Sequence, residues 1–174
     1  MLAILIPGVD LWDEKENRFI KVPQTTLKLE HSLFAISKWE SFYKKPFLSK
    51  DDKKYDETIY YIKCMTIEPV DDNVYYALSN TALIDIQTYI ADKKTATFFL
   101  TKDKDDDQHV VTSEEIYYWM IASEIPFSCD KWHLSRLMTL IKVCSEKNKK
   151  QKPMSEKEIY QRNAELKAAH RKNK

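Results

Sequence analysis

Four histidines and a few cysteines are the side chains of this 174-residue chain that are best suited to catalysis or metal binding. The histidines lie in separate segments, at His31, His109, His133 and His170. The chain contains neither an HExxH nor an HxH motif. Because protein zinc sites usually draw their ligands from closely spaced residues of this kind, the spacing predicts no metal site.

Cys129 and His133 have a spacing that would suit a nucleophile and its base. Four residues apart, they would share one face of a helix, but no orienting carboxylate and no oxyanion donors are evident beside them. His133 also follows Trp132 in a strongly apolar stretch, which favours a buried, hydrogen-bonded structural histidine. Together with Cys64 and Cys144, Cys129 forms no CxxC motif, so free and mostly buried thiols are expected.

The remaining chemical signals are weak. The acidic segment from Asp103 to Asp107 lacks the central glycine and the terminal glutamate of an EF-hand, and is expected to be a loop. Gly8 is the single glycine, which excludes the glycine-rich loops that hold nucleotide phosphates. The sequence therefore predicts no cofactor and no metal, and a protein that is not an enzyme.

Three strands are predicted at the start of the chain. Apolar or alternating residues favour strands over Leu2–Ile6, Asn17–Val22 and Thr25–His31, separated by Pro7-Gly8 and by Pro23. Short polar connections favour antiparallel pairing. We expect a small antiparallel meander in which each strand pairs with the next.

Helices follow, with apolar residues spaced three and four apart. They are predicted over 33–45, 57–67, 81–92, 112–123 and 129–147. Ser32, Asp56 and Asn80 are the expected N-caps of the first three, and Thr112 with Glu115 forms a capping box. Two further segments, 95–100 and 109–111, are strand-prone. The fold class is therefore α+β, with one domain over 1–147 that combines a small N-terminal antiparallel sheet and a helical core.

Aromatic side chains are abundant, with four tryptophans and ten tyrosines. The tryptophans fall beside Leu, Ile and Met, as core residues do. The pairs Tyr60-Tyr61, Tyr75-Tyr76 and Tyr117-Tyr118 each put one ring on the buried edge of a helix and one outward. Exposed tyrosines favour a protein interface, since a rigid amphipathic ring gives contact area at a low entropy cost.

The last segment, 148–174, reads as a basic linker and a C-terminal helix. From Lys147 onward the chain has ten Lys/Arg and three Asp/Glu, a net charge of +7, while the preceding 146 residues carry 18 and 24, a net of −6. Ser155 and Glu158 form a capping box, but the apolar stripe is thin, so that this helix would be marginal alone. The predicted partner-binding residues are Lys149, Lys150, Lys152, Ile159, Tyr160, Arg162, Leu166, Lys167, Arg171 and Lys172.

The expected location is the cytoplasm. The apolar run LAILI is too short for a signal peptide and has no basic flank. No run approaches the length of a membrane span, so no membrane association is expected. An acidic groove on a protein partner suits the basic segment best, head-to-tail self-association is an alternative, and nucleic acid is disfavoured because aromatic interleaving is scarce.

Four blocks of the sequence resemble proteins of tailed bacteriophages. They are IPGVDLWDEKENRFI, TLKLEHSLFAISKWES, EEIYYWMIASEIPFSCDKWHLSRLMTLIKVCSEKN and KPMSEKEIYQRNAELKAAHRK. The family that they resemble is that of the tail assembly chaperones, many of which are described only as uncharacterised phage proteins. The strand-like first 31 residues depart from the all-helical form expected of such chaperones.

The resemblance implies a non-enzymatic protein of phage virion morphogenesis in the host cytoplasm. Tail assembly chaperones are thought to coat the long tape-measure protein and to recruit tail-tube subunits, so these are the implied partners. Two alternatives stay open: a structural virion component, such as a head–tail connector or tail subunit, and a small nucleic-acid-binding phage regulator.

Overall fold

A computed structural model describes residues 1–14, 16–97 and 110–148, and internal contacts divide the chain into two compact units, Met1–Cys144 and Ser145–Lys174. The predicted α+β class is confirmed.

The strands are β1 (Leu2–Ile6), β2 (Val9–Asp13), β3 (Arg18–Val22) and β4 (Thr25–Leu29). The helices are α1 (Leu33–Tyr43), α2 (Tyr55–Met65), α3 (Asn73–Tyr76), α4 (Asn80–Ala91), α5 (Ser113–Ala122), the 3₁₀ helix η1 (Phe127–Lys131) and α6 (Leu134–Asn148). The predicted C-terminal helix lies outside the described residues, and the predicted boundary at residue 147 stays a prediction.

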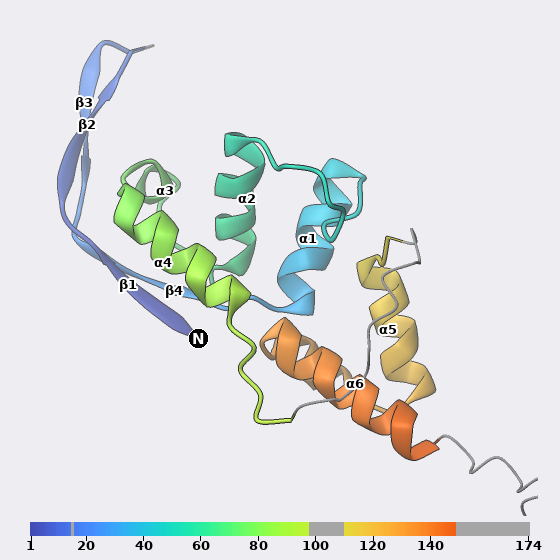
Figure 1. Ribbon diagram of the computed structural model, residues 1–174. Coiled ribbons are helices and arrows are strands. Elements are labelled where there is room, and N and C mark those ends of the chain that lie inside the picture. Colours follow the sequence, from blue (N-terminus) through green and yellow to red (C-terminus); the bar gives the residue numbers. More distant parts are fainter. Residues whose placement is uncertain (15, 98–109, 149–174) are drawn as a thin grey trace, which may run out of the picture. The chain divides into compact units, whose positions relative to one another are not determined.

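The four strands form one long, interrupted β-hairpin. β1 pairs with β4 and β2 pairs with β3, both antiparallel. Ile6 lies opposite Thr25 and Val9 opposite Val22, so the second ladder continues the first in the same register (Figure 1). Pro7 and Pro23 fall in the gap between them, where the missing N–H groups interrupt the ladder.

The expected three-strand meander is wrong. β2 was not predicted, because Pro7-Gly8 reads as the end of a strand and the polar residues after it read as a turn. In the structure β1 ends at Ile6, and the chain continues as a second strand, β2, from Val9. Gly8 permits a close approach of the two arms, since a Cβ atom at this position would lie 3.3 Å from the backbone nitrogen of Gln24.

The hydrophobic core joins the base of the hairpin to the helices. Its large, fully buried side chains come from β1, β4, α1, α2, α4, α5 and α6. The largest of them are Trp39, Ile6, Leu27, Leu29, Leu33, Ile36, Ile62, Met65, Ile86, Ile116, Met120 and Leu137. On α1 the buried residues Leu33, Ile36 and Trp39 recur every three positions, as the sequence pattern predicts for one face of a helix.

Helix ends follow the sequence signals in two of four cases. Ser32 caps α1 by accepting the backbone N–H of Ala35, and Thr112 with Glu115 forms the predicted capping box at α5. The other two caps were wrong by one or two residues. Ser79, not Asn80, caps α4, and α2 begins after Lys54, so that Asp56 lies in its first turn.

The predicted helix over 129–147 is divided in two. Residues 127–131 form η1, Trp132 is extended, and α6 begins at Leu134. The break arises because this backbone pairs with the end of the hairpin: Ser32 and His133 form a β-bridge, and the N–H of Leu134 donates to the carbonyl of His31 at 2.7 Å. Residues 95–97 and 110–111 form no strand, and the rest of those two strand-prone segments lies outside the described residues.

Candidate protein-binding site

The residues predicted to bind a partner lie outside the described residues. This holds for all ten, from Lys149 to Lys172, and also for the acidic segment from Asp103 to Asp107. Their role stays a prediction. The described residues bring other polar and aromatic groups together.

Cys129 and His133 do not share a helical face. Cys129 lies in η1, and His133 precedes α6, with the extended Trp132 between them. Both are buried, and the Nε2 of His133 donates to the carbonyl oxygen of Tyr89 at 3.1 Å. His133 is thus the structural histidine that its sequence context favours. All three cysteines are free, and burial raises the pKa of the Cys64 thiol to about 11, so that it is protonated at neutral pH.

His133 belongs to a buried pair of histidines at the base of the hairpin. Its ring lies 5.2 Å from that of His31, and the Nδ1 of His31 forms a hydrogen bond with the Tyr61 hydroxyl at 2.6 Å. The Nδ1 of His133 has no hydrogen-bond partner among the described residues. Burial, followed by the neighbouring His133, lowers the pKa of His31 to about 4. Burial therefore keeps His31 neutral at neutral pH, and the contacts of the two histidines join α1, α2, α4 and α6.

A second buried polar junction is centred on Glu40 of α1. Its carboxylate accepts the backbone N–H groups of Phe47 and Ser113, each at 2.8 Å, and the Ser113 hydroxyl. Ser113 is the first residue of α5, where backbone N–H groups lack helical partners and a negative charge is favourable. This junction ties α1 to α5 and to the connection after α1. It is structural, because all of its acceptors are used within the protein.

Among the described residues no group of three or more His, Cys, Asp or Glu is placed to hold a metal ion. None of the helices in the same part of the chain is long and apolar enough to cross a membrane. In the described part of the chain, the side chains suited to catalysis or metal binding are thus either buried in structural junctions or dispersed.

Exposed aromatic rings are the main feature of the surface. Tyr75 is buried and Tyr76 is 65% exposed, and Tyr118 is also 65% exposed beside the half-buried Tyr117, as predicted for these pairs. Tyr60 is half-buried beside the buried Tyr61. The expectation that all tryptophans are core residues is wrong for Trp12, which lies on β2 and is 49% exposed.

One set of these rings surrounds a pocket between α1, α2 and α3. This tyrosine pocket has a volume of about 240 Å³ and is lined by Phe42, Tyr43, Asp56, Ile59, Tyr60, Lys63, Asp72, Tyr75 and Tyr76. Phe42 stacks on Tyr60 with 4.3 Å between ring centroids, and Tyr43 meets the same ring edge-on at 5.6 Å. The pocket combines apolar ring faces with hydroxyl groups and with the ion pair of Lys63 and Asp72, 2.7 Å apart. Tyrosine-rich pockets of this composition are typical of the most energetically important parts of protein interfaces.

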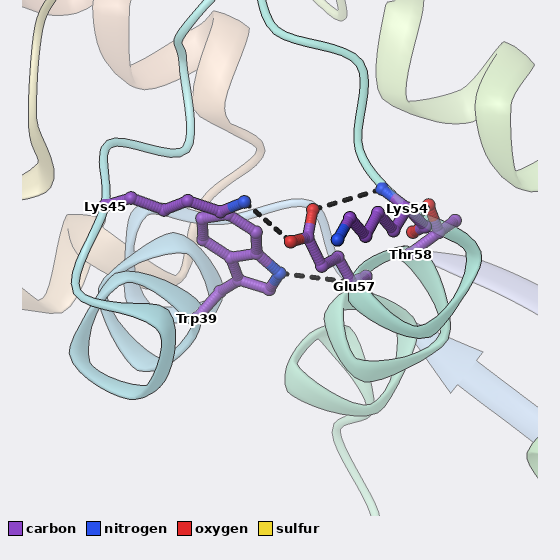
Figure 2. A network of polar contacts seen from close by, with 5 residues as sticks. All are labelled: Trp39, Lys45, Lys54, Glu57 and Thr58. Carbon is purple, nitrogen blue, oxygen red and sulfur yellow. Dashed lines mark hydrogen bonds and ion pairs between the residues drawn. The ribbon is translucent and has the colours of Figure 1, made fainter.

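A polar network holds the two helices that carry the pocket, as Figure 2 shows. The indole N–H of Trp39 on α1 donates to the backbone carbonyl of Glu57 on α2 at 3.0 Å. The Glu57 carboxylate accepts hydrogen bonds from the Nζ of Lys45 at 2.6 Å and from the backbone N–H of Lys54 at 3.1 Å. The hydrogen bond from Lys45, supported by that from Lys54, lowers the pKa of Glu57. This network ties α1 to α2 close in sequence to Phe42 and Tyr60, which line the pocket.

Sequence reasoning identified the rings but not the pocket. Phe42, Tyr60 and Tyr76 come from three helices, and no local pattern shows that these helices adjoin. The pairing of exposed and buried tyrosines was the available signal. No protein-family model, curated protein or solved structure matches this chain.

Proposed function

We propose that this protein is a non-enzymatic assembly factor that binds an apolar helix of a partner protein in the tyrosine pocket. The observation that carries the proposal is the exposure of Phe42, 60% exposed although it stacks on Tyr60 at the rim. An aromatic ring of this size left in water at a concave site is the arrangement that favours a protein partner.

The resemblance to tail assembly chaperones supplies the identity of that partner. A tape-measure protein contains long apolar helices that must be covered until the tail tube forms around them, and a ring-lined pocket is suited to an apolar anchor from such a helix. We therefore propose the tape-measure protein as the primary partner, tail-tube subunits as the second, and the host cytoplasm as the place of action. The basic segment from Lys149 to Lys172 would add electrostatic attraction to acidic partner residues.

Replacing Phe42 and Tyr60 by alanine tests the role of the pocket. We expect the F42A/Y60A variant to capture the tape-measure protein at least about tenfold less strongly than the wild type, because two interfacial rings are lost. The tagged full-length chain is expressed during infection, and captured proteins are quantified by mass spectrometry. Tyr118→Ala removes an equally exposed ring from α5 and is the matched control.

Two outcomes would contradict this proposal. If the wild type captures no tape-measure protein, the tape-measure protein is not its partner. A pocket variant that captures as much as the Tyr118→Ala control, while remaining folded by circular dichroism, would show that the pocket is not the binding site.

Deleting residues 149–174 tests the role of the basic segment. We expect the shortened chain to remain folded, since the described core lies before residue 149, and to bind its partner more weakly, with the difference shrinking at high salt as screening weakens charge attraction. The measurement is the same capture at low and at high salt. Equal binding by the full and shortened chains would refute the role of this segment.

A structural virion component is the second candidate, and the exposed Trp12 and Phe19 on the hairpin favour it. Rings that project on a strand pair suit a permanent contact with neighbouring subunits. Detection of the protein in purified mature particles would decide for this candidate, because an assembly factor is released before the particle is complete.

A further inference from the structure

The distal half of the hairpin carries opposite charges on its two strands. This arm, residues 9–22, consists of β2, β3 and the turn between them. β2 has the sequence VDLWD and contains two acidic and no basic residues, whereas β3 has the sequence RFIKV and contains two basic and no acidic residues. Within the arm Asp10 lies opposite Lys21, and Asp13 lies opposite Arg18. The segregation is complete along both strands.

The arm has two outer strand edges that no other described strand pairs with. In the described residues β2 and β3 pair only with each other, so each has an outer edge with backbone N–H and C=O groups directed outward. The base of the hairpin differs, because the N–H of Ile67 donates to the carbonyl of Lys28 on β4 at 3.0 Å. α3 packs against β3, where Val22 is buried, but exposure rises toward the tip and reaches 66% at Phe19.

The tip also carries an aromatic cross-strand pair. Trp12 and Phe19 lie opposite each other, with ring centroids 4.9 Å apart and an edge-to-face orientation. Both rings are largely exposed. Cross-strand aromatic pairs stabilise sheets, and a further strand at either edge would extend the row of rings.

The charges of β2 and β3 determine which strand edges of two copies can pair. Two β2 edges would set Asp10 and Asp13 against the same residues of a second copy, and two β3 edges would likewise bring Arg18 and Lys21 together. Like charges on neighbouring strands are destabilising. When β2 meets β3 of a second copy, every pair of the intramolecular register recurs: acidic with basic, and Trp12 with Phe19. The charge pattern therefore disfavours β2–β2 and β3–β3 pairing between copies and favours β2–β3 pairing.

We propose that copies of this chain associate through their arms, with the β2 edge of one copy pairing antiparallel with the β3 edge of the next. Such a contact is heterologous, because it joins two different surfaces. Each added copy leaves one free β2 edge and one free β3 edge, so the association continues into a ring or an open chain. Self-association by this route does not use the tyrosine pocket and does not depend on the function proposed for it.

Reversing the charge of one strand at a time tests the contact. The variant D10K/D13K has two basic strands, and the variant R18E/K21E has two acidic strands. We expect the wild type to show concentration-dependent association by sedimentation velocity at low salt. Each variant should associate about tenfold more weakly, since two opposite-charge pairs become like-charge pairs.

An equimolar mixture of the two variants provides the decisive comparison. The basic β2 of D10K/D13K then meets the acidic β3 of R18E/K21E, and the acidic β2 of the second meets the basic β3 of the first. We expect association to return in the mixture. A merely unfolded arm would not be rescued in this way, so recovery distinguishes a lost contact from a lost fold.

A full exchange keeps the hairpin's own pairs intact and serves as a second test. The variant D10K/D13R/R18D/K21D retains opposite charges across the arm, so it should fold and associate with itself. Sedimentation velocity of this variant alone should show the same concentration-dependent association as the wild type, because each β2–β3 contact between two copies again sets opposite charges together.

Three results would overturn the proposal. The first is a wild type that stays monomeric at the highest concentration tested. The second is association of D10K/D13K and R18E/K21E as strong as that of the wild type, which would place the contact elsewhere in the chain. The third is an exchanged variant that remains folded by circular dichroism but does not associate with itself, which would show that the opposite charges of the two strands do not direct the contact.

Discussion

Replacing Glu40 by alanine is expected to lower the free energy of unfolding by about 3 kcal/mol or more, because buried donors lose their acceptor. The backbone N–H groups of Phe47 and Ser113 and the Ser113 hydroxyl all donate to this carboxylate. None of them is at the surface in a position to find water instead. A loss of this size is a large fraction of the stability of an ordinary domain, about 5–15 kcal/mol.

Denaturant unfolding of the full chain, followed by circular dichroism, measures the effect. Asp85→Ala removes the same charge from an exposed position of α4 and is the matched control, expected to change the stability by less than about 0.5 kcal/mol. Glu40→Gln should fall between the two, since it keeps one acceptor oxygen. An alanine variant at residue 40 within about 1 kcal/mol of the wild type would contradict the structural role assigned to this junction.

Acid is expected to destabilise the protein through His31 at a pH where most carboxylates are still ionised. The folded protein holds the pKa of His31 at about 4, against 6.5 for an unperturbed histidine. The unfolded chain therefore binds a proton before the folded one does. The stabilising contribution of neutral His31 is complete above pH 6.5 and is lost as the pH falls from there toward 4. At pH 5.5 the expected loss from this group is about 1.4 kcal/mol relative to pH 7.5.

The groups around the histidine pair account for the lowered pKa of His31. His133 disfavours a charge on His31, whereas Glu30, paired with the N-terminal amine at 2.7 Å, favours one and is outweighed by burial. The Tyr61 hydroxyl lies 2.6 Å from the Nδ1 of His31 and can donate to it when the ring is neutral. On the other side of the pair, Tyr89 accepts from His133 through its carbonyl oxygen.

Comparison of the wild type with His31→Gln isolates the effect. Glutamine can still accept from Tyr61 but does not titrate, so the decline of the unfolding free energy between pH 7.5 and 5.5 should be shallower in the variant. NMR titration of the His31 ring provides an independent measurement of its pKa. Parallel pH profiles of the two proteins, or a His31 pKa near 6.5, would contradict the expectation.

The outcome of the tryptophan prediction shows where local pattern stops being informative. Trp39 lies in a helix whose apolar positions recur every three residues, and it is buried with its N–H bonded to Glu57. Trp12 lies in VDLWD, where alternation is hidden by the preceding Pro7-Gly8 and by the short length of the strand. Only the pairing of β2 with β3 shows that this ring faces Phe19 on the outside of the hairpin.

The sequence by itself determined the α+β class, most helix positions, two N-caps, the alternation of buried and exposed rings in the tyrosine pairs and the opposite charges of body and basic segment. These properties depend on near neighbours in the chain, because a helix face, a cap or a net charge is decided within a few residues. The tertiary structure alone decided that Glu40 and the two histidines are buried junctions, that Phe42, Tyr60 and Tyr76 surround one pocket, and that Asp10 and Asp13 oppose Lys21 and Arg18. Each of these joins residues from different elements, and such contacts are fixed by the packing of the whole core, which no local pattern encodes.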